Sequence, residues 1–299
     1  MKIAVTGSSG LIGSALVEAL RADGADVVRL VRGAPHGPED RSWDPGAGRL
    51  DPDAVADCDA VVHLAGAGIA DRRWTAAYKD EVLRSRVVGT EAVARALADA
   101  QRQGAGHRVL LSASAVGYYG DTGDRLTDES GPSGQGFLAD LVRRWEAATA
   151  AAEQAGVRVA HLRTGIVLSG RGGALRKQAR AAKAFAGAPL GSGRQYVPWI
   201  SLHDEVAAIR HLLGADVAGP VNLVGPAPVT NADFTRVLNR VVRRPTPPVH
   251  VPAAVLRIVL GEFADEGVLV GQRLAPTVLQ RSGFAFAHRD LKTALRANL

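Results

Sequence analysis

Apolar runs alternate with amphipathic segments along the first half of the chain. The runs are rich in Val, Leu and Ala and predict strands over residues 2–7, 26–31, 59–66, 107–116 and 157–168. Between them, apolar positions recur at helical spacing and predict helices over residues 11–24, 75–103 and 137–155. Buried apolar strands separated by helices are typical of a parallel sheet covered on both faces. The pattern therefore predicts an α/β fold with a doubly wound parallel sheet.

The second half of the chain follows a less regular pattern. Residues 220–252 are rich in proline, so we expect loops and short helices there. We expect these segments to form a smaller mixed α/β lobe over the carboxyl edge of the sheet.

A glycine-rich turn directly follows the first predicted strand. In VTGSSGLIG, Gly7, Gly10 and Gly13 have the spacing G-x-x-G-x-x-G at the start of a predicted helix. The first glycine permits a tight turn, the second lets a diphosphate approach the backbone, and the third lets the helix pack on the strand. Free N–H groups at the helix start would face the anion. The residues expected to hold it are Gly7, Ser9, Gly10, Leu11, Ile12 and Gly13. The alternative is a purely structural glycine turn.

The end of the second predicted strand selects between the two nicotinamide dinucleotides. Folds of this type that bind NAD(H) place a carboxylate there for the ribose 2′-hydroxyl. Residues 27–33 contain no carboxylate, and Arg32 stands about where the acid would be. A guanidinium suits a 2′-phosphate, so we predict NADP(H) as the cofactor. The alternative is that Arg32 is a solvated surface residue.

Composition narrows the class of protein. The 299 residues are 46% hydrophobic and 22% charged, which is ordinary for a globular protein. Cys58 is the only cysteine, which excludes an internal disulfide and suits a reducing compartment. Neither a signal peptide nor a membrane-spanning apolar run is present in the sequence, so we expect a cytoplasmic protein with no membrane partner.

Charge and motif content limit the partners. The formal net charge of +6 suits either an anionic ligand or a soluble arginine-rich surface. No nucleic-acid-binding motif and no metal-ligand spacing occurs, so we expect a small-molecule substrate, no nucleic acid and no metal. His63 lies inside a predicted buried strand, and we expect a hydrogen-bonded core histidine there.

Taken together, the motifs resemble the extended short-chain dehydrogenase/reductase superfamily, and within it the atypical branch of epimerase family proteins. The resemblance covers essentially the whole chain and rests on VTGSSGLIG, HLAGAGIADRRWT, SRVVGT, SASAVGYYGD, GFLADLVRRWEAA, LRTGIVLS and GSGRQYVPWISLHD. The carboxyl-terminal part resembles the domain of unknown function found in this branch. The resemblance implies a Rossmann-like NADP-binding domain of residues 1–166 and about 196–225, with a substrate-binding lobe of residues 167–195 and 226–299.

The resemblance also implies cofactor contacts outside the glycine turn. These residues are Leu64, Ala65, Gly66, Glu81, Arg86, Ser112, Thr164, Gly165 and Ile166. Arg86 fills a slot where the superfamily often has asparagine, and Glu81 would orient it. The alternative is an ion pair on the helix surface.

The usual catalytic pair of the superfamily is missing from this chain. A reductase site of this superfamily combines a Ser or Thr, here Ser114, with a Tyr-x-x-x-Lys pair that handles the proton. The helix that should carry the pair reads Phe137-Leu-Ala-Asp-Leu141, and a shift by one residue gives Leu138 and Val142. A phenol with an ordinary pKa is a poor base at neutral pH without such a lysine.

Two tyrosines could replace the missing one. Tyr118 and Tyr119 follow Ser114 by a few residues, and the resemblance places one of them at the substrate pocket. The alternative is that both are wall or core residues. We therefore expect Ser114, Tyr118 and Tyr119 to be the catalytic candidates.

Two functions remain open from the sequence. The first is an NADP(H)-dependent oxidoreductase or epimerase-like enzyme acting on a small carbonyl or sugar-like substrate. The second is a non-catalytic NADP(H)-binding sensor or scaffold. The resemblance also implies a homodimer formed by the helices at 75–103 and 137–155. The apolar residues that serve either this interface or the chain's own core are Leu138, Leu141, Val142 and Trp145.

Overall fold

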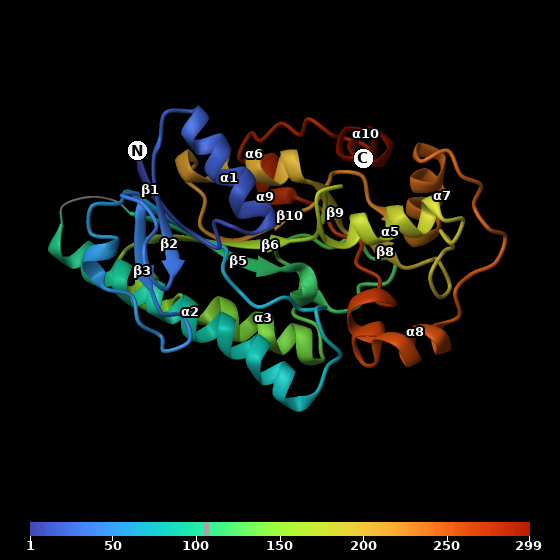
Figure 1. The fold of residues 1–299 in the computed structure, drawn as a ribbon, viewed down its shortest axis with the longest axis horizontal. Coiled ribbons are helices and arrows are strands. Elements are labelled where there is room, and N and C mark those ends of the chain that lie inside the picture. The colour runs from blue at the N-terminus through green and yellow to red at the C-terminus, as the bar shows by residue number, and fades with distance from the viewer. Residues whose placement is uncertain (105–107) are drawn as a thin grey trace. The chain divides into compact units, whose positions relative to one another are not determined.

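One sheet of seven strands organises the fold. The computed structural model describes residues 1–104 and 108–299. The strands lie in the order β10-β6-β5-β4-β1-β2-β3 (Figure 1). Their bounds are β1 (Lys2–Thr6), β2 (Asp26–Arg32), β3 (Asp40–Trp43), β4 (Ala60–His63), β5 (Val109–Ala115), β6 (Arg158–Thr164) and β10 (Gly219–Leu223). The pairs β1–β2, β1–β4, β2–β3 and β4–β5 are parallel, which confirms the predicted doubly wound α/β fold.

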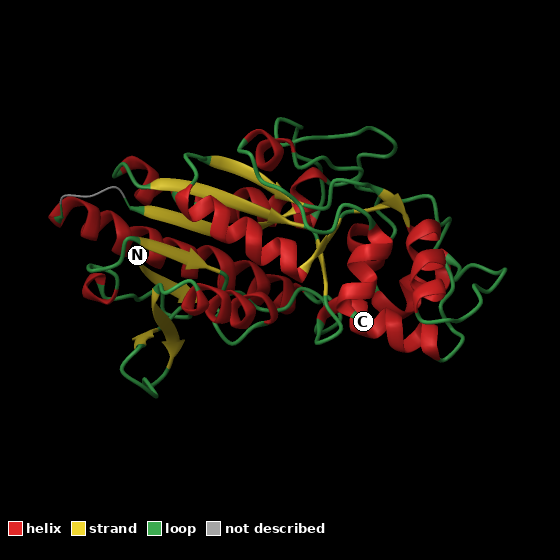
Figure 2. Cartoon of the chain, turned by 90° about the horizontal axis from the view of Figure 1, so that it is seen from above, coloured by secondary structure: helices red, strands yellow, loops and turns green. Residues whose placement is uncertain are grey.

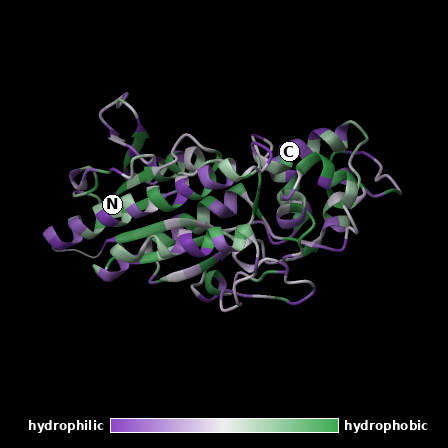
Figure 3. Cartoon of the chain, turned by 90° about the horizontal axis from the view of Figure 1, so that it is seen from below, coloured by the Kyte–Doolittle hydropathy of each residue, from purple (hydrophilic) through white to green (hydrophobic). Residues whose placement is uncertain are grey.

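Helices cover both faces of this sheet. The helices of the described chain are α1 (Leu11–Ala22), α2 (Ala76–Gln103), α3 (Phe137–Ala147), α4 (Ala150–Gln154), α5 (Gly173–Lys183), α6 (Leu202–Gly214), α7 (Asn231–Val241), α8 (Ala253–Leu260), α9 (Thr277–Arg281) and α10 (Leu291–Asn298). Helices α1 and α2 lie on opposite faces (Figure 1), and Figure 2 shows the strands as neighbouring yellow arrows. Because both faces are covered, the strands are mostly hydrophobic, as their green colour in Figure 3 shows.

The chain divides into two compact units. The first consists of Met1–Ser114, Leu141–Leu162 and Ala208–Pro220, and the second of Ala115–Asp140, Arg163–Ala207 and Val221–Leu299. In the first unit, Val28, Val61 and Leu97 belong to a core that joins the sheet to α2. In the second, Leu175 and Phe234 belong to a separate core that joins α5 to α7.

Several predicted elements differ from the structure. The predicted strand 157–168 is two strands, β6 and β7 (Ile166–Leu168), and β7 pairs with β9 (Trp199–Ser201). The chain changes partner at Gly165, where an added Cβ would overlap the carbonyl oxygen of Pro198. The predicted helix 137–155 is interrupted between α3 and α4, where the N–H groups of Ala148 and Thr149 donate three residues back, to Trp145 (3.2 Å) and Glu146 (3.2 Å). The segment 220–252, which we expected to form loops and short helices, contains part of β10, the short strand β11 (Val229–Thr230) and helix α7. The first residue of the predicted strand 107–116, His107, lies outside the described residues.

A buried chain of hydrogen bonds joins the sheet to α2 and α3. The Thr6 hydroxyl lies 2.8 Å from Nδ1 of His63, and Nε2 of His63 lies 3.0 Å from the Thr90 hydroxyl, which also accepts the indole N–H of Trp145 (3.0 Å). Burial lowers the pKa of His63 to about 4, so the ring is neutral at physiological pH. The expectation of a hydrogen-bonded core histidine is confirmed.

Removing the Thr90 hydroxyl tests this chain of hydrogen bonds. The Thr90→Val variant keeps the shape of the side chain but removes the acceptor of the Trp145 indole and the partner of His63. We expect the free energy of unfolding to fall by about 1–3 kcal/mol, the cost of unsatisfied buried polar groups. Urea denaturation measures it, with Thr90→Ser as the control that keeps the hydroxyl. Equal stability of the two variants would contradict this interpretation.

Candidate functional site

The glycine turn brings the start of α1 against the end of β1. Gly7 has φ +65°, and the Gly10 N–H donates to the Gly7 carbonyl (2.9 Å). A Cβ at Gly13 would overlap that same carbonyl oxygen, so only glycine permits this approach. Gly10, the N-cap of α1, provides no side-chain cap, and the first turn has no acidic residue. The first-turn N–H groups and the helix dipole are therefore suited to an anion such as a diphosphate.

The turn lies where the strand order reverses. β1 pairs with β2 on one side and β4 on the other, which is where ligands bind in open α/β sheets. A Cβ at Gly7 would lie 2.9 Å from the carbonyl carbon of Leu64, which follows β4. The Thr6 hydroxyl accepts the N–H groups of Leu64 (3.0 Å) and Ala65 (3.1 Å). These two residues therefore present side chains and carbonyls to a ligand rather than N–H groups, and Gly66 is exposed beside them.

Arg32 provides an exposed positive charge at the end of β2. The two carboxylates next to this edge are already paired: Arg29 contacts Glu39 (3.5 Å) and Asp40 (2.7 Å). Across residues 1–104 and 108–299, no carboxylate pairs with Arg32. The guanidinium is thus available to an anionic group at the position where an NAD(H)-binding chain would carry an acid.

A second arginine, Arg86, lies against the loop that follows β4. Its guanidinium carbon is 4.9 Å from the centre of the Trp145 ring, and a Cβ at Gly66 would lie 3.6 Å from its side chain. Glu81 does not orient Arg86 as expected, because it pairs with Arg72 (3.4 Å). Burial lowers the pKa of Arg86 to about 10, so it stays cationic at neutral pH. Within the described part of the chain, no carboxylate forms an ion pair with it.

Ser114, at the end of β5, is bonded to a carboxylate that sequence reasoning missed. Its hydroxyl donates to Oε1 of Glu146 on α3 (2.6 Å). Glu146 lies about two helical turns beyond Leu138, on the helix that should carry the tyrosine and lysine. The quoted motif GFLADLVRRWEAA contains this glutamate, but only the folded chain brings it to Ser114. Ser112 is buried one pleat earlier on the same strand.

The two tyrosines lie in a polar cluster of the second unit. Tyr119 is 3% exposed, donates to the Asn222 side chain (2.7 Å) and accepts from Arg163 (2.9 Å). Burial raises the pKa of Tyr119 to about 12, which makes it a weak proton donor and favours a structural role. The Arg163 guanidinium carbon also lies 3.5 Å above the ring centre of Tyr118. Their catalytic assignment stays a prediction.

The segment 164–166 uses its backbone N–H groups within the second unit. The Gly165 N–H donates to Leu223 (3.0 Å) and the Ile166 N–H to Pro198 (2.6 Å). The Thr164 hydroxyl donates to Glu205 (2.9 Å), a fully buried carboxyl that the sequence did not indicate. Burial raises the pKa of Glu205 to about 8. These residues therefore have fewer free donors for a ligand than expected.

The start of α3 differs from a site built on tyrosine and lysine. Both oxygens of the Glu266 carboxylate accept N–H groups there, from Phe137 (3.1 Å) and Leu138 (2.8 Å). A carboxylate at a helix N-terminus is stabilised by the helix dipole. Further along α3, Val142 and Trp145 are buried by the chain itself, as is Leu141. Of the two expectations for these three residues, the structure supports packing within the chain.

Comparisons with known proteins agree with this geometry. The NAD dependent epimerase/dehydratase family matches residues 3–225, and a domain of unknown function (DUF1731) matches residues 251–297. The chain belongs to the NAD dependent epimerase/dehydratase family. Epimerase family protein Mb2239 of Mycobacterium bovis is 51% identical over 294 residues, which are 98% of this chain and 96% of the relative.

Two solved structures of related proteins are also similar over the full chain. Human epimerase family protein SDR39U1 (isoform 2), solved with NADPH, has a TM-score of 0.87 at 31% identity and covers 100% of this chain and 99% of its own. A nucleoside-diphosphate sugar epimerase from Corynebacterium glutamicum has a TM-score of 0.81 at 35% identity and covers 100% of this chain and 58% of its own. The expected branch and its carboxyl-terminal domain are confirmed.

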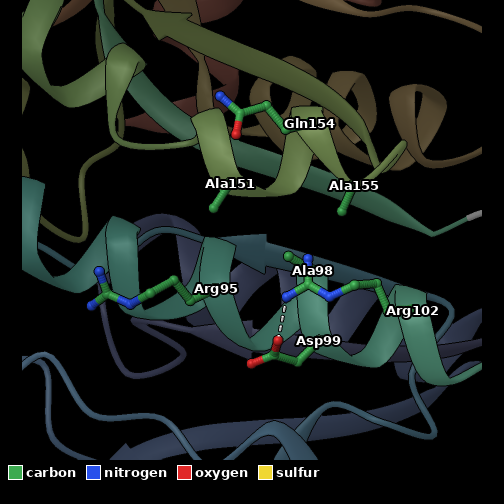
Figure 4. Close-up of a pocket in the computed structure, with 7 residues that line it drawn as sticks. All are labelled: Arg95, Ala98, Asp99, Arg102, Ala151, Gln154 and Ala155. Carbon is green, nitrogen blue, oxygen red and sulfur yellow. Dashed lines mark hydrogen bonds and ion pairs between the residues drawn. The ribbon is translucent and has the colours of Figure 1, made fainter.

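A pocket elsewhere in this family member does not belong to the cofactor site. It has a volume of about 230 Å³ between α2 and α4 (Figure 4) and is lined by Arg95, Ala98, Asp99, Arg102, Ala151, Gln154 and Ala155. The α2 residues of this lining lie in the carboxyl-terminal half of that helix, which in a βαβ unit faces the amino ends of the strands. Ligands of this fold bind at the carboxyl ends.

Among the described residues, no group of three or more His, Cys, Asp and Glu side chains could hold a metal ion. In the same part of the chain, every helix is too short or too polar to cross a membrane.

The buried carboxyl of Glu205 predicts a pH-dependent stability. Its pKa is about 8 in the folded chain and near the ordinary 4.5 when unfolded, so unfolding releases a proton between these values. Its contribution to stability is therefore full below about pH 4.5 and is lost as pH rises through 8, at about 1.4 kcal/mol per pKa unit. We expect Glu205→Gln to gain stability relative to the wild type between pH 5 and pH 9 in urea denaturation. Glu91→Gln, at an exposed ion pair, should follow the wild type, and a parallel course of Glu205→Gln would contradict the assignment.

Proposed function

We propose that this chain binds NADP(H) at the glycine turn and acts as an oxidoreductase or epimerase-like enzyme on a small carbonyl or sugar-like substrate. The observation that carries the proposal is the exposed guanidinium of Arg32, which stands without an acidic partner among the described residues beside the turn of residues 7–13. A 2′-phosphate would pair with it. The NADPH in the related human structure supports the same choice of cofactor.

The residues of the first unit fit the parts of such a cofactor. The N–H groups of Leu11 and Ile12 would bind the diphosphate at the positive end of α1. Arg86 would add a second positive charge at the loop after β4. The other contacts that we propose are Ser9, Leu64, Ala65, Gly66, Ser112, Thr164, Gly165 and Ile166, without Glu81, which pairs with Arg72. When bound, the nicotinamide would supply or accept the hydride, and the chain would orient the substrate and handle its proton.

A non-catalytic NADP(H) sensor or scaffold is the second candidate. It is favoured by the apolar residues at the positions of the superfamily's tyrosine and lysine, Phe137 and Leu141, or Leu138 and Val142 in the register shifted by one. The Glu266 cap at the start of that helix also favours it. NADPH consumption with a panel of aldehydes, ketones and nucleotide sugars separates the two. Tight binding without consumption by any of them would favour the sensor.

Location and oligomeric state are further parts of the proposal. The single cysteine, buried Cys58, suits the reducing cytoplasm. A homodimer would need contacts other than Leu141, Val142 and Trp145, since the chain itself buries them. Light scattering of the purified protein measures the oligomeric mass.

Substitution of Arg32 tests the choice of cofactor. We expect Arg32→Gln to weaken NADPH binding by about ten- to a hundred-fold, the value of a hydrogen bond to a charged group, and to leave NADH binding unchanged. Fluorescence titration with both cofactors measures the ratio. The control is Arg49→Gln, an exposed arginine paired with Asp44. The same loss for NADH as for NADPH would argue against a 2′-phosphate contact.

A further inference from the structure

The hydroxyl of Ser114 is held in a short bond to a carboxylate. The distance of 2.6 Å between Ser114 Oγ and Glu146 Oε1 lies in the range of a charge-assisted O–H···O⁻ bond. Ser114 is 5% exposed. Ser112 is in register with His63, the last residue of β4, and Ser114 lies two residues further along β5, beyond the end of β4. The pair is therefore at the sheet edge where the loop after β4 and the glycine turn lie.

The backbone around Glu146 is fixed by its neighbour. Trp145 is buried, and its indole N–H is bonded to Thr90 on α2. The same ring carries the guanidinium of Arg86 at 4.9 Å. The carboxylate of the pair therefore comes from the helix on which related enzymes carry a phenol and an ammonium, and its hydroxyl comes from β5.

We propose that Ser114 and Glu146 form the proton-transfer pair of this chain, with an alcohol or its carbonyl counterpart as the substrate. The inference rests on the proposed function. Ser114 would be the catalytic residue that touches the substrate oxygen, and Glu146 the positioning residue that holds the proton behind it. The Tyr119 hydroxyl already donates a hydrogen bond to Asn222 and accepts one from Arg163. Ser114 and Glu146 are therefore better suited than Tyr119 to transfer the substrate's proton.

The proposed proton and hydride transfer conserves atoms and electrons in both directions. In oxidation, the substrate hydroxyl gives its proton to Ser114 Oγ while the Ser114 proton passes to Glu146 Oε1. The hydrogen on the carbinol carbon leaves with its electron pair to oxidised NADP, so the alcohol becomes a carbonyl and the cofactor is reduced. In reduction, the carbonyl carbon accepts a hydride from NADPH, and its oxygen takes the proton that returns from Glu146 through Ser114.

Four variants test the pair: Ser114→Ala, Glu146→Gln, Glu146→Asp and the control Glu91→Gln. Infrared difference spectra should show a carboxylate band that is absent in Glu146→Gln and shifted in Ser114→Ala. The affinity of all four variants for NADPH should stay within about twofold of the wild-type value. NADPH oxidation by 4-nitrobenzaldehyde, a carbonyl probe, should fall about a hundred-fold or more in Ser114→Ala and Glu146→Gln, the usual range for lost acid–base catalysis. Glu146→Asp should restore much of the rate, and Glu91→Gln should match the wild type.

The failures of the two proposals are distinguishable. Equal oxidation rates in the wild type and Glu146→Gln, including none in either, with NADPH still bound, would overturn the role of the pair and leave cofactor binding intact. Failure of the wild type to bind NADPH would overturn the proposed function and this inference with it. An unshifted carboxylate band in Ser114→Ala would show that the two groups are not bonded in solution and would also overturn the pair.

Discussion

Helix α1 starts against the carbonyl of Gly7 because Gly13 has no side chain, and the rest of the site depends on this contact. The contact places the first N–H groups of α1 next to the end of β1. It also sets the turn against Leu64, whose N–H and that of Ala65 are held by the Thr6 hydroxyl. The turn and the loop after β4 are therefore one arrangement, in which each part fixes the other without a ligand.

Around this arrangement the charges are distributed unequally. Arg32 and Arg86 lack carboxylate partners within the described ranges, whereas the acids near β2 are all paired. Two guanidinium groups without a carboxylate partner, one at the end of β2 and one at the loop after β4, favour a ligand with several negative charges. These charges fit the binding half of a dinucleotide site. For the chemical half, the pair proposed above is a hydroxyl and a carboxylate, in a chain that lacks the phenol and ammonium of the superfamily.

The parts of this account that could be predicted depend on short-range patterns. The Val and Leu runs identify β1, β2, β4 and β5, and glycine spacing identifies the turn and the start of α1. Strand β3 escaped prediction because its sequence, DRSW, is short and largely polar, and it pairs only at the sheet edge. The break at Gly165 escaped because its cause is a close approach to Pro198, distant in sequence.

Side-chain pairs across long separations were equally out of reach. Ser114 and Glu146 are 32 residues apart, and Tyr119 and Asn222 are 103 apart. Glu266 caps α3 from 128 residues beyond Leu138. A motif indicates which residue types a known chemistry needs. It does not indicate that a different residue, brought close by folding from another helix or strand, stands in their place.

The most direct test of the central claim is a crystal structure of the protein with NADPH. The account predicts diphosphate oxygens within hydrogen-bond distance of the Leu11 and Ile12 N–H groups and a 2′-phosphate paired with Arg32. A cofactor bound elsewhere, or bound at the turn with its 2′-phosphate away from Arg32, would contradict it.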